Sequence, residues 1–413
     1  MNAAPPVNRT IIFFFFTILL LALAVCLFQP TRSAVVHAQS TLGGPIPNLT
    51  TLETSLFNQG FQAFIHLWDP QQGLGAAYNQ EACSVCHKDP VIGGNSTQKI
   101  TFFGTLNFDG TFNPLSSEGG PFLQAQPFQF QQCLIKGEKI PPDATIAAVH
   151  QAPQTFGAGL IDNIPPAQIS AQAVDKGMGV HGITNMVLDQ NGKLQVGRFG
   201  LKAQFANLLQ TDASELQSEI GVTNPLFPTE DLPGGQPIPP NCSIKIEPND
   251  DGKQLIALYH YNVYLAPNSP GSGNAHGQLL FNSVGCNLCH LPSYKTAHRV
   301  FIPVAFKGRF LESHALEDQP VNLYSDLLLH DMGASLSDGY PVGLATGSMF
   351  RTAPLWGLST RIADGDGLLH DGRAKDVVSA IGFHGGEAAQ VITNFNALSS
   401  GDQADVIAFI SSL

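Results

Sequence analysis

The sequence predicts a mainly α-helical fold of two related halves joined by long loops. Apolar residues recur at helical spacing along Leu52–Trp68 and again along Val406–Leu413. Strand-like alternation is rare and short, and 29 prolines and 41 glycines interrupt the chain. One five-residue pattern, Cys-x-x-Cys-His, occurs once in each half. Together these three observations indicate a duplicated helical module.

The composition limits the class of protein. A chain of 413 residues is long enough for two or three domains with extensive cores. Hydrophobic residues make up 43% and charged residues 13%, which excludes disorder driven by charge. The formal net charge of −12 argues against nucleic acid as a partner, because phosphate backbones bind basic surfaces.

Residues 1–38 are predicted to be a signal peptide. An uncharged apolar run, Ile11–Phe28, follows the lone Arg9 and ends before Pro30, and we expect cleavage near Ala38. The run is also close to the minimum length of a membrane span, so a retained N-terminal anchor is the alternative. In both cases we expect an exported chain that lies in, or faces, the periplasm.

The repeated Cys-x-x-Cys-His pattern is the strongest chemical signal. Its members are Cys83, Cys86, His87, Cys286, Cys289 and His290. Two thiols three positions apart can bond the two vinyl groups of one porphyrin, and the following histidine can ligate the iron. A zinc site would need further ligands nearby, and a redox dithiol needs no histidine. We therefore predict two covalent haem c groups.

Two further cysteines, Cys133 and Cys242, remain in the mature chain. In an oxidising compartment we expect them to form a structural disulfide. The bridge would close a loop of roughly 110 residues, worth about 4–5 kcal/mol in the loop-entropy model. Two free thiols are the alternative.

A weak internal repeat supports two modules. An Ala-Pro pair followed by an aromatic-Gly pair occurs at Ala152–Gly157 and at Ala353–Gly357, at nearly the same distance after each haem histidine. A segment rich in proline and glycine separates the halves. We expect a first haem domain at 45–228 as the catalytic candidate, a connector at 229–260, and a second haem domain at 261–413 for electron transfer.

The chain resembles the di-haem oxidoreductase family of the bacterial di-haem cytochrome c peroxidase superfamily. The resemblance runs from Phe57 to Leu413 and implies two all-α, cytochrome c-like domains, the first with an insertion. Some members carry the label thiol oxidoreductase, but the cysteines here are assigned to haem and to the expected bridge. The most specific stretches are Gly73–Gly75, Gly197–Gly200, Leu327–Gly333, Phe350–Leu358, Leu369–Ala374 and His384–Ala388.

The resemblance implies different ligands for the two haems. In the superfamily a distal ligand follows an HxG motif by fourteen residues, which here leads from His370 to His384. The second haem is thus expected to have a His290/His384 pair, of lower potential than His/Met. A structural role for His384 is the alternative.

The first haem of the superfamily keeps an open distal face with a glutamate nearby, and Glu219 falls at that place. Glu219 would accept the first proton of hydrogen peroxide and return it to the leaving oxygen. A solvated helix carboxylate is the alternative for Glu219. His150 or His181 could instead occupy the distal face of the first iron.

A calcium ion is an additional expectation from the resemblance. Gln151, Gly365 and Gly367 align with positions that hold calcium in the peroxidases. Gln151 stands where those relatives usually have Asn, and the glycines could bind calcium only through their carbonyl oxygens. An ordinary turn at Asp364–Gly367 is the alternative.

The leading hypothesis is an exported di-haem oxidoreductase of peroxidase type. Hydrogen peroxide would be reduced at the first haem with electrons relayed through the second from a small donor, a cytochrome c or a cupredoxin. The negative charge favours a basic donor. The alternatives are a di-haem oxygenase or oxidase that uses O2, and a pure electron-transfer cytochrome with both haems doubly ligated. The oligomeric state stays open.

Overall fold

The computed structural model describes residues 41–242, 247–268, 271 and 273–413. The predicted signal peptide at 1–38 lies outside them. Helix accounts for 30% and strand for 17% of the structure, so the fold is mixed and the prediction of a mainly α fold was wrong in this respect. Within the described ranges, no helix is both long enough and apolar enough to cross a membrane.

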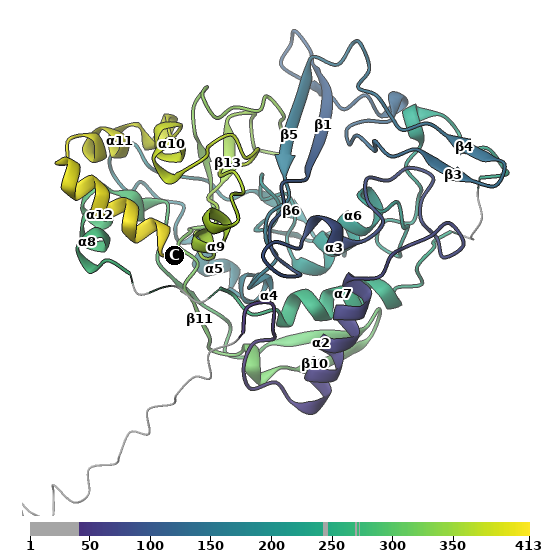
Figure 1. The fold of residues 1–413 in the computed structure, drawn as a ribbon, viewed down its shortest axis with the longest axis horizontal. Coiled ribbons are helices and arrows are strands. Elements are labelled where there is room, and N and C mark those ends of the chain that lie inside the picture. The colour runs from purple at the N-terminus through teal and green to yellow at the C-terminus, as the bar shows by residue number, and fades with distance from the viewer. Residues whose placement is uncertain (1–40, 243–246, 269–270, 272) are drawn as a thin grey trace, which may run out of the picture. The chain divides into compact units, whose positions relative to one another are not determined.

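The helices are mostly short, and the longest cluster in two groups (Figure 1). The α-helices are α2 (Thr51–Phe64), α3 (Cys83–Cys86), α4 (Ala158–Asp162), α5 (Pro166–Ser170), α6 (Leu208–Ser218), α7 (Lys253–Tyr264), α8 (Ala275–Val284), α9 (Leu358–Ala363), α10 (Val377–Gly382), α11 (Ala389–Asn396) and α12 (Ser400–Ser411). The 3-10 turns are η1 (Ser116–Glu118), η2 (Pro233–Gly235), η3 (Cys286–Leu288), η4 (His314–Leu316) and η5 (Gly386–Ala388).

The strands form small antiparallel sheets. One sheet has three strands in the order β2-β1-β5, and the remaining pairs are β3-β4, β6-β7, β8-β11, β9-β10 and β12-β13. Such short strands give little alternation for a sequence pattern to detect. The strands are β1 (Lys99–Leu106), β2 (Phe112–Asn113), β3 (Phe128–Phe130), β4 (Cys133–Ile135), β5 (Ile146–Gln151), β6 (Met186–Leu188), β7 (Leu194–Val196), β8 (Tyr294–Lys295), β9 (Phe301–Ala305), β10 (Arg309–Glu312), β11 (Pro320–Val321), β12 (Leu329–Asp331) and β13 (Met349–Arg351).

Two helix pairs repeat the same packing. α2 lies across α7, and α8 lies across α12. Each pair meets at a glycine, because a Cβ on Gly60 would clash with the backbone of α7 and a Cβ on Gly277 would clash with that of α12. Aromatic rings fill both crossings: Phe64 and Tyr261 have centroids 4.7 Å apart, and Phe281 and Phe409 5.3 Å apart.

Local signals in the sequence explain where these helices begin. Thr50 and Glu53 form a capping box on α2, with the Thr50 N–H donating to Glu53 Oε2 at 2.7 Å. Asn274 caps α8 through the Gly277 N–H, and Ser399 caps α12 through the Asp402 N–H. These caps fix the first turn of α2, α8 and α12, whereas α7 begins after Gly252, which has no side chain to cap it.

The two repeat segments, Ala152–Gly157 and Ala353–Gly357, lie against one another. Gly157 and Gly357 both have a left-handed backbone, with φ of 72° and 75°, and each begins a short helix. The Gly157 N–H donates to Leu265 O and the Gly357 N–H donates to Leu413 O, just after α7 and α12 respectively. Gln154 Nε2 donates to Trp356 O at 2.5 Å, which joins the two copies.

This repeat relates α7 to α12. α7 packs on α2, and the residue that follows it, Leu265, is the counterpart of Leu413 at the end of the chain. The expected boundary between residues 260 and 261 falls inside α7. The division into two haem domains otherwise stays a prediction.

The expected disulfide is present. Cys133 on β4 is bonded to Cys242, with the Cα atoms 4.9 Å apart and 109 positions between them in sequence. Both residues are buried with Phe128 in a small separate cluster. The bridge ties the β3-β4 hairpin to the segment that leads to α7.

Candidate haem sites

The first Cys-x-x-Cys-His motif is a single helical turn. Cys83 and Cys86 lie one turn apart on α3, and the His87 N–H closes the turn on Cys83 O at 3.0 Å. Both thiols are free. Burial raises the pKa of Cys86 to about 12, with a further contribution from Glu219, and raises that of Cys83 as well. The structure therefore presents two protonated thiols and one histidine, the set that a covalent haem requires.

His87 has the surroundings of an axial ligand. Burial lowers its pKa, so the imidazole is neutral and keeps a lone pair for a metal. The carbonyls of Pro153 and Gly94 lie near enough to oppose this shift, but neither meets hydrogen-bond geometry with the buried Nδ1. The ring of Phe64 packs at 6.1 Å between centroids.

The second motif repeats this geometry. The His290 N–H closes the turn on Cys286 O at 2.9 Å, and Phe281 packs on the imidazole at 6.4 Å. His290 Nδ1 lies 3.0 Å from Tyr324 O. Since a carbonyl can only accept, Nδ1 carries the proton and Nε2 carries the lone pair. Burial lowers the pKa of His290 to about 4, so the imidazole is neutral.

His384 approaches His290 with the same tautomer. It follows α10, and its Nδ1 donates to Ala380 O at 2.8 Å, which leaves the Nε2 lone pair free. Burial lowers its pKa, and the two imidazoles are close enough for His384 to contribute to the low pKa of His290. Two neutral imidazoles with free Nε2 atoms fit the two axial ligands of one haem iron.

Glu219 lies beside the first motif at the end of α6. Its Oε2 accepts a hydrogen bond from Asn79 Nδ2 at 3.3 Å. Burial, and then the neighbouring Glu215 carboxyl, raise the pKa of Glu219 to about 8. Both carboxyls in turn contribute to the raised pKa of the Cys86 thiol. The structure thus brings the predicted distal glutamate to the first haem motif and gives it a carboxyl partner.

No sequence motif marks Glu215 as that partner. Glu215 lies one turn before Glu219 and is exposed to solvent, and desolvation raises its pKa to about 7. Asp212 lies one turn earlier, has a buried unpaired Oδ2, and adds to the raised pKa of Cys83. The spacing of Asp212, Glu215 and Glu219 along one helix face was the available signal.

The two alternative distal residues for the first haem, His150 and His181, contact carboxylates in the described part of the chain. His150 is buried on β5, and its Nε2 lies 2.9 Å from Asp338 Oδ2. His181 is largely exposed, and its Nε2 lies 3.8 Å from Glu387 Oε1, three residues after His384. The contacts described for these two side chains do not involve His87.

The predicted calcium residues are already engaged in protein contacts. Gln151 Nε2 donates to Ser96 O at 2.7 Å. The Gly367 carbonyl accepts from Arg361 Nε at 2.9 Å and from Nη2 of the same guanidinium. A positive charge on this carbonyl is unfavourable for a cation at the same atom. Gly365 is exposed. Calcium stays a prediction, and these contacts count against Gly367 as a ligand.

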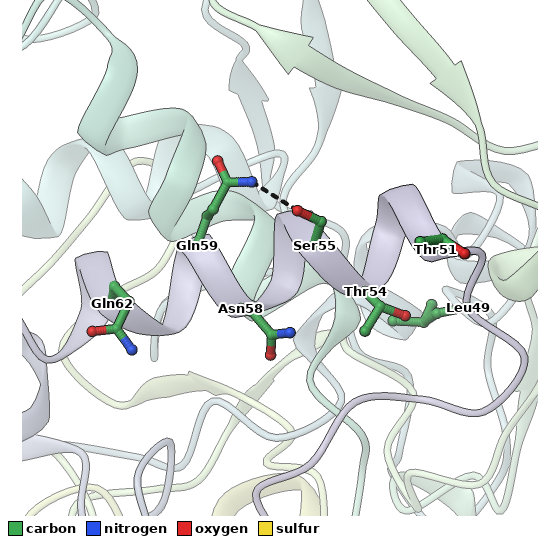
Figure 2. A pocket seen from close by; sticks show the side chains of 7 residues that line it. All are labelled: Leu49, Thr51, Thr54, Ser55, Asn58, Gln59 and Gln62. Atoms are coloured by element: carbon green, nitrogen blue, oxygen red, sulfur yellow. Dashed lines mark hydrogen bonds between the residues drawn. The ribbon is translucent and has the colours of Figure 1, made fainter.

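A surface groove of about 680 Å³ follows the exposed face of α2 (Figure 2). Its side chains are neutral, and Gln59 donates to Ser55 at 3.0 Å within it. None of the predicted site residues lines this groove, so the groove is separate from the two haem motifs. The lining residues are Leu49, Thr51, Thr54, Ser55, Asn58, Gln59 and Gln62.

The sequence matches the family described as "Di-haem oxidoreductase, putative peroxidase" over residues 126–238 and 256–413. The chain belongs to the di-haem oxidoreductase family. The match covers about two thirds of the chain and includes Glu219, His290 and His384, whereas the first Cys-x-x-Cys-His motif lies before its start. Family membership agrees with two haem c sites at the two cysteine pairs.

Two solved structures are distantly similar. The hydrazine synthase of Kuenenia stuttgartiensis is 13% identical, with a TM-score of 0.35, over 93% of this chain and all of its own. A MauG-like protein associated with microbial copper homeostasis is 14% identical, with a TM-score of 0.33, over 89% of this chain and 92% of its own. Similarity at this level carries no argument about function. A search of curated proteins finds no match.

Proposed function

We propose that this di-haem oxidoreductase is an exported enzyme of peroxidase type that reduces hydrogen peroxide at the first haem. The observation that supports this most directly is the difference between the two haem motifs. A second imidazole, His384, faces the second motif, whereas the Glu215–Glu219 carboxyl pair lies at the first. An iron with two strong ligands transfers electrons, and one with an open face can bind an oxidant.

The first site would hold its haem through Cys83, Cys86 and His87. When bound, the haem supplies an iron centre that delivers electrons to peroxide. The pKa values of about 7 and about 8 mean that the carboxyl pair Glu215 and Glu219 retains protons near neutral pH. An ionised member can take a proton from hydrogen peroxide, and a protonated member can give one to the leaving oxygen. Two protons and two electrons convert each hydrogen peroxide to two waters.

The second site would hold its haem through Cys286, Cys289, His290 and His384. The carbonyls of Tyr324 and Ala380 fix the tautomer and the orientation of the two imidazoles. A fixed ligand pair keeps reorganisation small when an electron arrives or leaves. This site would take electrons from a small donor, a cytochrome c or a cupredoxin, and the net charge of −12 favours a basic one.

Export to the periplasm is supported by the Cys133–Cys242 disulfide, since such bridges persist in oxidising compartments. Whether the N-terminal segment is removed or retained as an anchor is decided by the mass of the mature protein. Calcium is a further proposal, which a metal analysis of the purified holoprotein would test.

The absorption and EPR spectra of the oxidised holoprotein test the proposed function. We expect one low-spin haem with two imidazole ligands and one high-spin haem whose signal changes on addition of cyanide or peroxide. Two low-spin haems that stay unchanged after half-reduction would instead identify an electron-transfer cytochrome. A high-spin haem that turns over O2 but not hydrogen peroxide would identify an oxygenase or oxidase.

A further inference from the structure

Four charged side chains form a buried cluster beside the second Cys-x-x-Cys-His motif. We call Lys176, Asp326, His330 and Glu387 the His330 cluster. His330 lies on β12 and is 1% exposed, and Asp326 is fully buried. The histidine belongs to the motif Leu327–Gly333, for which the proposed function has no role. The proposed function does not account for two cations and two anions placed at this depth.

Both ring nitrogens of His330 contact carboxylates. Nε2 lies 2.9 Å from Asp326 Oδ2, and Nδ1 lies 2.8 Å from Glu387 Oε2. Because a carboxylate oxygen only accepts, both nitrogens must donate, and the ring is an imidazolium. Burial by itself would lower the pKa of His330, but hydrogen bonds to Asp326, Cys289 and Glu387 raise it to about 12.

The imidazolium also contacts the second haem motif directly. His330 Nδ1 lies 3.6 Å from Cys289 Sγ, the sulfur that would carry a thioether bond to the porphyrin. Gly182, with a φ of 53°, packs so closely on the ring that a Cβ would lie 2.6 Å from His330 Cε1. The ring is therefore held in place from both sides, with one N–H directed between the sulfur and the Glu387 carboxylate.

The other members of the cluster join separate parts of the second site. Lys176 Nζ donates to Leu288 O at 2.6 Å, within the motif, and to Asp326 Oδ2 at 2.7 Å. The Asp326 N–H donates to Cys289 O at 2.9 Å. Glu387 follows His384 by three residues and accepts from the N–H groups of His181 and Gly182, both at 3.0 Å.

We propose that His330 is a positioning residue that holds a fixed positive charge at the Cys289 sulfur and thereby raises the reduction potential of the second haem. The inference rests on the proposed function in one respect, namely that a haem is bonded to Cys286 and Cys289.

The direction of the effect follows from charge. Reduction adds one negative charge to the haem, and a nearby cation stabilises that charge more strongly where water is excluded. An N–H donated to the sulfur also withdraws electron density from the porphyrin edge. A haem with two imidazole ligands has a low intrinsic reduction potential. A cation beside Cys289 would raise this potential toward the potential of the electron donor.

Three variants of the holoprotein test the proposal by potentiometric titration of the low-spin haem. His330→Asn keeps an N–H donor but removes the charge, and we expect the potential of this haem to fall. Glu387→Gln removes a negative charge from the same cluster, and we expect the potential to rise. His314→Asn is the matched control, because His314 pairs with Glu317 on the exposed surface, and we expect no shift.

Potential shifts of opposite sign in the two variants indicate an electrostatic role for the cluster. A general loosening of the site would shift the potential of the low-spin haem in the same direction in both variants. The proposal is overturned if His330→Asn leaves the potential unchanged or raises it, or if Glu387→Gln fails to raise it. If His330→Asn does not fold, the larger neutral substitution His330→Gln takes its place, with the same expected fall in potential. Haem content and the high-spin signal are recorded for each variant, so a failure of the proposed function shows separately as missing haem or absent peroxide reactivity.

Discussion

Glu215 and Glu219 are the two residues whose protonation would control peroxide chemistry at the first haem. They are one turn apart at the end of α6, beside Cys86, and burial raises the pKa of each. A single buried carboxyl with a pKa of about 8 would be protonated at neutral pH and could not accept a proton. A pair can do both, because one member ionises while the other keeps its proton.

Glu219→Gln is expected to lower the kcat for hydrogen peroxide by about 10²- to 10⁴-fold, the usual contribution of one general acid–base group. The absorption spectrum of the oxidised protein should be unchanged, because Glu219 bonds no haem atom. Steady-state peroxidase assays with a reduced donor measure the effect. Glu312→Gln, which alters an exposed surface ion pair with Arg299, is the control and should keep full activity. Undiminished turnover in Glu219→Gln would remove this residue from the mechanism.

The same carboxyl gives stability a defined pH dependence. Between about pH 4.5 and about pH 8, Glu219 stays protonated in the folded protein, whereas the unfolded chain releases that proton. The folded state then binds more protons, so the free energy of unfolding falls as the pH rises through this window. In the Glu219→Gln variant, this decrease in the free energy of unfolding with rising pH is expected to be absent. We expect the Tm of the variant minus the Tm of the natural protein to be larger at pH 7.5 than at pH 4.5. If this difference is equal or smaller at pH 7.5, Glu219 does not have a raised pKa in the folded protein.

Each of the two helix crossings, α2 on α7 and α8 on α12, places a phenylalanine ring beside a haem-motif histidine: Phe64 beside His87, and Phe281 beside His290. Each depends on one glycine, because the helices approach until backbone touches backbone. Glu53 adds a polar contact to the first crossing: it is 1% exposed and accepts from the Tyr264 hydroxyl at 3.1 Å and from the Ser313 hydroxyl at 2.5 Å. Burial raises the pKa of this carboxyl, but these bonds and those from Thr50 leave it below its ordinary value.

Gly277→Ala is expected to destabilise the protein by about 1–3 kcal/mol, because the added methyl group forces α8 and α12 apart. Gly401→Ala is the matched control within the same helix pair, since no atom lies closer than 3.8 Å to its added Cβ, and it should stay within about 0.5 kcal/mol of the natural protein. Chemical denaturation of the two variants measures the difference. Equal stabilities would show that the crossing relaxes without cost.

The sequence was informative about elements that have caps or one apolar face, and uninformative about the others. α2 and α12 were predicted because one face of each is apolar. α7 was missed because nearly all of its residues from Leu255 onward are buried, so no polar face marks its period. The three-residue strand β12 is too short to show alternation. At the sites, spacing identified Cys86 and His290, but only the fold brings Glu215 to the first motif.

At the scale of the whole molecule, the Cys133–Cys242 bridge joins the β3-β4 hairpin to residues that lie 109 positions later in the sequence, beside a hydrogen bond from Asn241 Nδ2 to Gln132 O at 3.0 Å. The cluster around it is small, with Phe128 as its main buried apolar partner. Its contribution to stability is therefore expected to come from restricting the unfolded chain, because the bridge spans 109 positions.

The double variant Cys133→Ala/Cys242→Ala is expected to lose about 4–5 kcal/mol of unfolding free energy, the loop-entropy value for a bridge of this span. Haem content should not change, because neither cysteine belongs to a haem motif. Denaturant titration of the two proteins measures the loss, and treatment of the natural protein with a dithiol should reproduce it. A loss well below 1 kcal/mol would mean that the unfolded chain stays compact without the bridge.

The contact between the repeat segments Ala152–Gly157 and Ala353–Gly357 limits the substitutions that each segment can accept. A Cβ on Gly157 would meet the Trp356 ring, and a Cβ on Gly357 would meet the Gln154 side chain. Each copy of the duplicated segment is thus part of the environment that selects the other. A substitution that enlarges Gly157 or Gly357 is therefore expected to need a smaller side chain at Trp356 or Gln154, respectively.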